Sequence, residues 1–206
     1  MFGSAAAAVL TTLTGVVAQA QDPAPIAASI VDKAVADSWR RVSPELQARI
    51  DQDEAQRLCS VHRNDLPPKV AEALAAVAQG AIVYPANGKL SGDWKKGEAG
   101  SLSGYGFRMG DDPKRLAGGN CYACHQLSPR EISYGTLGPS LLGYGKLKGN
   151  TPEIQKQTYE KIFNAQAALA CSNMPRFGQN KVLSPEAIKD YVAFLLDPSS
   201  PVNKDP

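Results

Sequence analysis

The sequence predicts an all-α protein. Apolar residues recur every three to four positions in several segments, which is the period of a helix that buries one face. Capping residues followed closely by proline mark three helix starts, and no alternating strand pattern precedes residue 121. With 206 residues, 43% of them hydrophobic, the chain can bury a core in one domain with an extension or in two small domains.

The N-terminal residues are typical of an export signal. Residues 5–17 are small and apolar without a charge, and Ala18-Gln19-Ala20 offers the small-x-small pattern of a cleavage site. We predict a signal peptide over residues 1–20, although its usual opening basic residue is missing, and a buried N-terminal helix is the alternative. No later stretch is apolar enough to span a bilayer, so we predict a periplasmic protein without a membrane span.

The charge pattern argues against a nucleic-acid partner. The 22 basic and 20 acidic residues are interspersed, and the formal net charge is +2. A nucleic-acid-binding protein would concentrate basic residues on one surface or in one tail. We therefore expect no nucleic acid among the partners.

Residues 21–88 are predicted to form an N-terminal helical extension. Its first helix is indicated by four apolar residues at helical spacing, namely Ile26, Ile30, Val35 and Trp39. A second short helix is expected over residues 44–58. The third should be capped by Asp65, carry a proline pair in its first turn and end at Gly80.

A glycine-rich segment and two later helices complete the predicted fold. Residues 88–110 contain seven glycines, which favours loops around a bulky group, a partner surface or a linker. Further helices are expected over residues 152–169, capped by Thr151, and over residues 184–196, capped by Ser184.

The chemistry of the chain is concentrated in one Cys-x-x-Cys-His motif. Residues 121–125 read Cys121-Tyr122-Ala123-Cys124-His125. Two thiols one turn apart along a helix can each add to a vinyl group of haem, and the adjacent imidazole can then reach the iron. We therefore predict one covalent haem c, held by Cys121 and Cys124, with His125 as an axial iron ligand.

Two other interpretations of the motif use the thiols without haem. A thioredoxin-like dithiol needs a βαβ setting, and no strand pattern lies upstream. A zinc site needs four ligands, and it would have to draw on Cys59, Cys171 and His62 from distant segments. We favour haem over both.

The second axial iron ligand can be sought by elimination. Met109 and Met174 are the two methionines that follow the predicted signal peptide. Met174 precedes Pro175 in a polar loop, where the proline prevents a helix and a methionine is poorly placed to fill a core. We predict Met174 as the ligand, with Met109, His62 and Cys171 as alternatives.

A Gly-Pro turn is placed to support His125. It begins at Gly138, thirteen residues after the histidine, and continues into Pro139. A backbone carbonyl of this turn could accept the free N–H of the imidazole and fix its tautomer. An ordinary surface turn is the alternative.

The two cysteines outside the motif are Cys59 and Cys171. An exported protein folds in an oxidising compartment, so we predict a disulfide between them. It would hold the extension beside the loop that contains Met174-Pro175, which we call the methionine loop. Two unpaired thiols, an intermolecular bridge and iron ligation by Cys171 remain alternatives.

Over residues 89–200 the chain resembles the class I cytochrome c family. The resemblance lies in the motif at residues 121–125, the turn at Gly138, the Met174-Pro175 loop and the closing helix. A closer resemblance is to the SoxX family of single-haem cytochromes. It covers the runs Gly92-Asp93-Trp94-Lys95-Lys96-Gly97-Glu98, Gly119-Asn120-Cys121-Tyr122-Ala123-Cys124-His125-Gln126-Leu127 and Cys171-Ser172-Asn173-Met174-Pro175-Arg176-Phe177-Gly178.

This resemblance implies a fold, a partner and a reaction. The fold would be a small all-α bundle around haem over residues 89–206, the class I cytochrome c fold, preceded by the extension. The partner would be a SoxA-like haem subunit in a heterodimer that oxidatively joins thiosulfate to a cysteine of a SoxYZ-like carrier. This chain would be the non-catalytic electron-transfer subunit of that L-cysteine S-thiosulfotransferase and would pass electrons to a downstream cytochrome c.

A free-standing electron shuttle is the alternative function. A shuttle needs only a compact domain with an exposed haem edge, whereas this chain adds an extension and a glycine-rich segment. Those additions favour a permanent partner surface. No residue of the chain resembles the transferase nucleophile.

Overall fold

The protein is described here by a computed structural model. It describes residues 24–40, 42, 44, 47, 50–106, 110–112 and 114–204. Every regular element in these ranges is helical, and they contain no strand, so the all-α prediction is confirmed for them. The predicted signal peptide and the candidate ligand Met109 lie outside the described residues.

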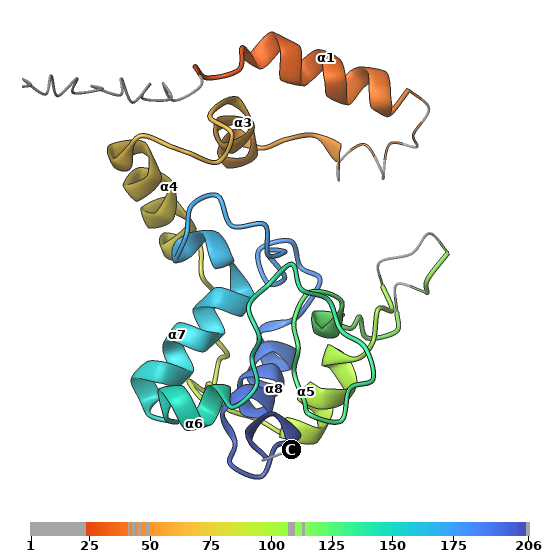
Figure 1. Ribbon diagram of the computed structural model, residues 1–206, viewed down its shortest axis with the longest axis vertical. Helices are drawn as coiled ribbons and strands as arrows, with labels where there is room; N and C mark the ends of the chain where they lie inside the picture. Colours follow the sequence, from red (N-terminus) through yellow and green to blue (C-terminus); the bar gives the residue numbers. More distant parts are fainter. Residues whose placement is uncertain are drawn as a thin grey trace, which may run out of the picture.

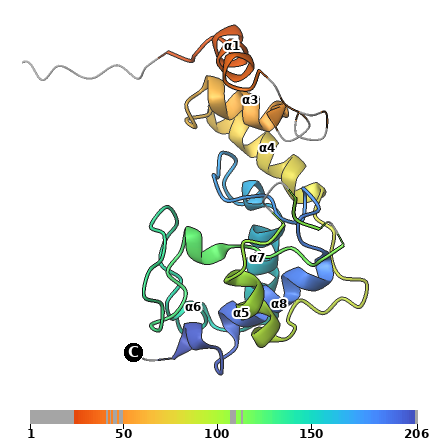
Figure 2. The same ribbon diagram turned by 90° about the vertical axis from the view of Figure 1, so that its right-hand side faces the viewer.

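The helices form a body with the extension lying across one end (Figure 1). The described helices of the extension are α1 (Ala28–Ser38), α3 (Glu54–Val61) and α4 (Pro68–Gly80). The body contains α5 (Trp94–Ser101), α6 (Tyr144–Lys148), α7 (Pro152–Phe163) and α8 (Pro185–Leu196), with short 3₁₀ turns η1 (Cys121–Ala123), η2 (Ala165–Ala167) and η3 (Pro201–Asn203). The chain between η2 and α8 lies between the extension and the body (Figure 2).

The helices of the body begin where the sequence predicts. The Ser184 hydroxyl accepts from the N–H of Ala187 at 3.1 Å, and the Thr151 hydroxyl accepts from Ile154 at 3.4 Å. Each hydroxyl satisfies a backbone donor that has no partner inside the helix. However, α7 ends at Phe163 rather than at residue 169, because Asn164 adopts φ −153° and ψ 100° and redirects the chain into η2.

The extension differs from the prediction in two helix boundaries. The second helix was expected to run without a break over residues 44–58. The described residues 44, 47 and 50 are helical, but residues 51–53 are not, and α3 begins at Glu54, where Asp53 and Gln56 form a reciprocal capping box. The third helix is not capped by Asp65, because α4 begins only at Pro68. A residue that precedes proline is disfavoured in the α region, so the proline pair delays the helix.

The core of the body is formed mainly by α7 and α8. Its buried members are Tyr159, Ile162, Phe163, Phe177, Leu183, Ile188, Tyr191, Val192 and Leu196. The opposite side of α8 carries Phe194, which packs with Leu127 and Val202 in a second buried cluster. In α8, buried residues therefore recur at helical spacing, as predicted.

The glycine-rich segment contains a helix that was expected to be loop. Asp93 caps α5 by accepting from the N–H of Lys95 at 2.9 Å. A Cβ on Gly97 would lie 2.1 Å from the carbonyl oxygen of Asp190 and 2.7 Å from Cβ of Phe194. Glycine is therefore required here, because it allows α5 to cross α8 at backbone distance.

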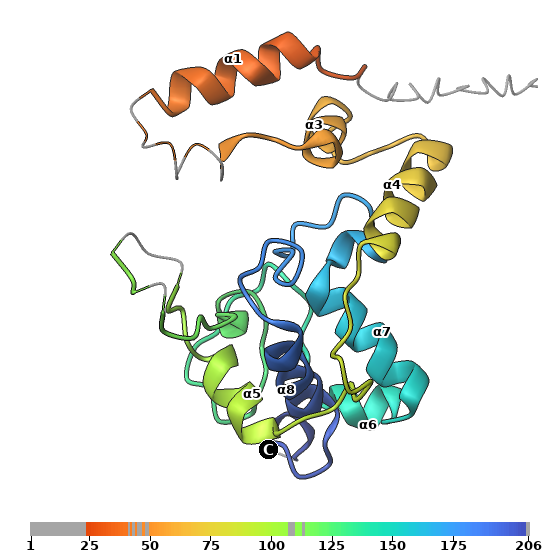
Figure 3. The same ribbon diagram turned by 180° about the vertical axis from the view of Figure 1, so that it is seen from behind.

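The segment that joins α4 to α5 runs along the outside of the body (Figure 3). The Tyr159 hydroxyl of α7 donates to the carbonyl of Val83 at 2.7 Å, and the Tyr84 hydroxyl donates to Glu160 at 2.6 Å. These bonds attach the extension to α7. In the described part of the chain, no helix has both the length and the apolar character that a bilayer span requires.

Candidate functional site

The Cys-x-x-Cys-His motif forms one tight turn. Asn120 adopts a left-handed conformation with φ 50°, and η1 begins at the next residue. The carbonyl of Cys121 accepts from Cys124 at 3.1 Å and from His125 at 2.9 Å. The turn is a 3₁₀ turn rather than the α-helical turn that we expected, and neither of its cysteines belongs to a disulfide.

The imidazole of His125 is oriented by the predicted Gly-Pro turn. Its Nδ1 lies 2.7 Å from the carbonyl oxygen of Pro139. A carbonyl can only accept a hydrogen bond, so in the neutral imidazole Nδ1 carries the proton and Nε2 keeps its lone pair. This is the tautomer that can bind a metal through Nε2, and the predicted contact between the turn and His125 is confirmed.

Two glycines allow this loop to lie directly against the motif. A Cβ on Gly138 would stand 2.2 Å from Cε1 and 2.8 Å from Nε2 of His125. A Cβ on Gly135 would stand 1.7 Å from the carbonyl oxygen of Ala123. Neither position can accept a side chain without displacing the motif. The sequence analysis missed this packing, although the Gly138-Pro139 turn itself was found.

The Cys121 thiol lies in an apolar environment next to both buried clusters of the body. Burial raises its pKa to about 11, and a hydrogen bond with Ser101 acts in the opposite direction. The free thiol is therefore protonated at neutral pH. Reactive redox dithiols depend on a lowered thiol pKa, so this environment argues against a thioredoxin-like site.

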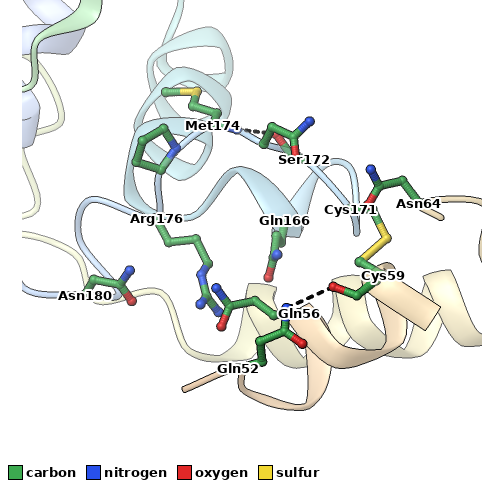
Figure 4. A pocket seen from close by; sticks show the side chains of 13 residues that line it. Gln52, Gln56, Cys59, Asn64, Gln166, Cys171, Ser172, Met174, Arg176 and Asn180 are labelled. Carbon is green, nitrogen blue, oxygen red and sulfur yellow. Dashed lines mark hydrogen bonds between the residues drawn. A yellow bond between two sulfur atoms is a disulfide. The ribbon is translucent and has the colours of Figure 1, made fainter. Parts of the chain in front are cut away.

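Met174 lies on the same core as Cys121. Its half-buried side chain packs against the cluster of α7 and α8. Its backbone N–H donates to the Ser172 hydroxyl at 3.3 Å, and Pro175 follows without a donor. In Figure 4 the Met174 side chain points away from the disulfide, and Arg176 points in the opposite direction.

The predicted disulfide between Cys59 and Cys171 is present. It joins α3 to the methionine loop, with the two Cα atoms 5.6 Å apart. Both thiols are consumed, so the zinc site that needed them is excluded, and so is Cys171 as an iron ligand. Among the described residues, no group of three or more His, Cys, Asp or Glu side chains is arranged to hold a metal ion.

A second link between α3 and the methionine loop was not predicted. The Arg176 guanidinium donates to the Asp53 carboxylate at 2.5 Å, across 123 positions of sequence. Only 14% of the Arg176 side chain is exposed. A polar cavity of about 310 Å³ lies beside this link, between the extension and the loop. No local sequence signal could have paired two residues so far apart.

The residues around the motif suit a large, flat apolar cofactor. Several large apolar side chains are strongly exposed on the chain before and after the motif, namely Leu102, Leu116, Ile132 and Leu137. A protein rarely leaves that many on neighbouring loops without a ligand or partner to cover them. Two unpaired thiols, an imidazole with a free Nε2 and a thioether on the same core are donors of the kind that haem c requires.

Comparison with known proteins identifies one relative. No protein-family model matches the chain. An uncharacterized lipoprotein of Aquifex aeolicus (strain VF5) is 43% identical over 165 residues, which cover 74% of this chain and 73% of that protein. The chain therefore belongs to the same family as this lipoprotein.

Proposed function

We propose that the protein is an exported, single-haem c-type cytochrome with the class I cytochrome c fold, and that it transfers electrons. Cys121 and Cys124 would hold the haem through thioether bonds, and His125 and Met174 would be the axial iron ligands. When bound, the haem supplies one-electron redox chemistry.

The observation that carries this proposal is the contact between His125 and Pro139. At 2.7 Å, the carbonyl favours the proton on Nδ1 and so leaves the lone pair of Nε2 available to a metal. Gly138 lies against the same ring, so the imidazole has little freedom to rotate. An oriented neutral imidazole beside two unpaired thiols is what covalent haem with a fixed proximal ligand needs.

Met174 determines which kind of haem chemistry is proposed. A thioether in the sixth position closes the iron to small ligands, which favours electron transfer over gas binding or peroxide reduction. Histidine with methionine also gives a higher reduction potential than more electron-donating ligand pairs. The packing of Met174 on the same core as Cys121 supports this role.

Export is supported by three observations. The relative from Aquifex aeolicus is described as a lipoprotein, a class of exported protein. The Cys59–Cys171 disulfide is of the kind that persists in oxidising compartments. Residues 1–20 have the pattern of a signal peptide. These observations support export, and we propose that the compartment is the periplasm.

Within this class, we propose a SoxX-like role in a heterodimer with a SoxA-like haem subunit. The proposal rests on the sequence runs around Gly97, Cys121 and Met174 that resemble the SoxX family. The partner would hold the reacting centre for thiosulfate, and this chain would pass the released electrons to a downstream cytochrome. The extension, linked covalently to the methionine loop, adds surface for such a partner.

A free-standing electron shuttle is the second candidate, because a soluble haem domain alone can perform that function. Purification from the native host separates the two candidates. A stable complex with a second haem subunit, together with loss of thiosulfate oxidation on deletion, is expected for the SoxX-like role. A lone monomer whose deletion leaves thiosulfate oxidation unchanged would favour the shuttle.

Ligation is tested by optical and electron-paramagnetic spectroscopy of Met174→Ala. Wild type should show the charge-transfer band between sulfur and ferric iron, and Met174→Ala should lose it while keeping the covalent haem. Met109→Ala is the matched control and should keep the band. If Met109→Ala loses the band and Met174→Ala retains it, the assignment is wrong.

A further inference from the structure

We propose that α3 of the extension is a clamp that positions Met174 against the iron. This inference rests on the proposed function, because it takes Met174 as an iron ligand. It assigns a role to two residue pairs that are distant from the motif: the Cys59–Cys171 disulfide and the Asp53–Arg176 ion pair.

Both links between α3 and the methionine loop bracket Met174. The disulfide attaches residue 171 to Cys59, and the ion pair attaches Arg176 to Asp53 at the start of α3. Met174 therefore lies three residues after one link and two residues before the other. A segment this short, held at both ends by one rigid helix, has few conformations available.

The ion pair is built into the start of α3. One oxygen of the Asp53 carboxylate accepts from the N–H of Gln56 at 2.9 Å, and the other accepts from Arg176 at 2.5 Å. The Gln56 side chain in turn accepts from the N–H of Asp53 at 3.0 Å. Asp53 is thus fixed by the helix before it meets the arginine, and the pair loses less side-chain freedom when it forms.

The core holds the C-terminal side of the loop as well. Phe177 follows Arg176 directly, is only 4% exposed and belongs to the buried cluster of α7 and α8. Its carbonyl accepts from Val182 at 2.9 Å and from Leu183 at 3.1 Å. Within the described residues, the backbone N–H of Met174 makes one long hydrogen bond, to Ser172, and its side chain is half-buried against the core. The flanking attachments therefore add to this packing in fixing the position of Met174.

The consequence is preorganisation of a weak ligand. A thioether is a neutral ligand that an added imidazole can displace, and displacement is easier when the loop is free to move away. Fixing both ends of the loop removes conformational entropy in advance, which favours the bound thioether over its competitor. The side-chain directions in Figure 4 agree with this division of roles, since Arg176 points toward α3 and Met174 points away.

The experiment measures the affinity of the ferric holoprotein for imidazole by loss of the charge-transfer band. Asp53→Asn removes the charge of the clamp but keeps a good helix cap. We expect imidazole to bind about threefold more tightly to this variant, as suits one partly exposed ion pair. Asp32→Asn is the matched control, because it removes the 2.6 Å ion pair with Arg57 in the same extension without touching the loop.

Two further variants separate the clamp from general stability. Cys59→Ser/Cys171→Ser should tighten imidazole binding by at least about tenfold, because it frees one end of the loop. Arg176→Lys, which keeps the charge, should lie between wild type and Asp53→Asn. Far-UV circular dichroism of each variant at the assay temperature verifies that the helices remain folded.

Three outcomes are decisive. If Asp53→Asn binds imidazole as wild type does, while its haem is attached and its helices are intact, the clamp is refuted and the cytochrome assignment stands. Equal tightening by Asp32→Asn also refutes it, because the effect would then belong to the extension as a whole. Absence of covalent haem from wild type refutes the proposed function and this inference together.

Discussion

His125 illustrates how single residues define the site. Its ring is bounded on one side by the carbonyl of Pro139 and on another by the backbone of Gly138. The first contact selects the tautomer, and the second leaves no room for a side chain. The spacing between the histidine and the turn therefore matters as much as the cysteines do.

Substitution of Gly138 tests this arrangement. We expect Gly138→Ala to displace the imidazole, because the new Cβ would lie 2.2 Å from Cε1 of His125. Haem should still attach through Cys121 and Cys124, but the optical spectrum of a six-coordinate iron should be lost. Gly80→Ala is the control, because position 80 has open space and should keep the wild-type spectrum. An unchanged spectrum in Gly138→Ala would contradict the proposed orientation.

At the scale of elements, the crossing of α5 and α8 holds the body together. It depends on Gly97 and Gly100, whose missing side chains let α5 approach the backbone of Asp190 and the ring of Tyr191. The Cys-x-x-Cys-His motif is attached to α5 beside this crossing. The N–H of Gly119, two residues before Cys121, donates to the carbonyl of Gly100 at 2.9 Å. A change in the helix crossing would thus be transmitted to the turn that carries the Cys-x-x-Cys-His motif.

Enlarging Gly97 should weaken this crossing. We expect Gly97→Ala to destabilise the protein by about 1–3 kcal/mol, the usual effect of overpacking a close contact. Urea unfolding followed by circular dichroism measures the change. Gly80→Ala, at the exposed end of α4, should be neutral or slightly stabilising. Equal stability of the two variants would show that the helices do not meet at Gly97.

The attachment of the linking segment to α7 predicts a dependence on alkaline pH. Burial, assisted by the hydrogen bond and the charge of Glu160, raises the pKa of Tyr84 from 10.0 to about 12. The folded state therefore holds this proton more tightly than the unfolded state does. The stabilisation is fully present below pH 10 and is lost as the pH rises through 12.

Urea unfolding at a series of alkaline pH values tests this dependence. Wild type should lose stability more steeply than Tyr84→Phe between pH 10 and 12, because only wild type has the phenol that titrates there. Parallel curves for the two proteins would contradict the assignment.

Sequence patterns predicted the elements whose physical cause is local. Ser184 and Thr151 cap their helices because a side-chain oxygen needs only the next turn. The helix at residues 94–101 was missed because glycines usually indicate a loop. Here they are needed for close contact with α8, which is distant in sequence and which no local pattern reveals. The Asp53–Arg176 pair was missed for the same reason. The role of the Gly138-Pro139 turn was predicted because it follows the motif closely.

At the scale of the whole molecule, the extension and the body are joined by links of several kinds. The disulfide spans 112 positions, and the Asp53–Arg176 pair lies beside it. Hydrogen bonds from Gln79 of α4 and from Tyr84 after it attach the extension to Glu160 of α7. The extension is therefore a structural part of the protein. Through these links, α3 of the extension is attached next to Met174, the proposed iron ligand, although more than 100 residues separate the two in sequence.

The disulfide should dominate the stability of this connection. Closing a loop of 112 residues stabilises the folded state by roughly 4 to 5 kcal/mol in the chain-entropy model. The free energy of unfolding of Cys59→Ser/Cys171→Ser, measured in urea without reductant, should be lower than that of wild type by roughly 4 to 5 kcal/mol. Adding reductant should weaken wild type to the same level. A wild type that is insensitive to reductant, with the bridge verified as broken, would contradict this account.

The central claim is that Cys121 and Cys124 carry one covalent haem. The most direct measurement is the intact mass of the exported protein, produced with the haem-attachment machinery and unfolded before analysis. The account predicts the mass of the processed chain plus one haem, and the bare chain for Cys121→Ala/Cys124→Ala. A wild-type protein that weighs no more than its processed polypeptide would contradict it.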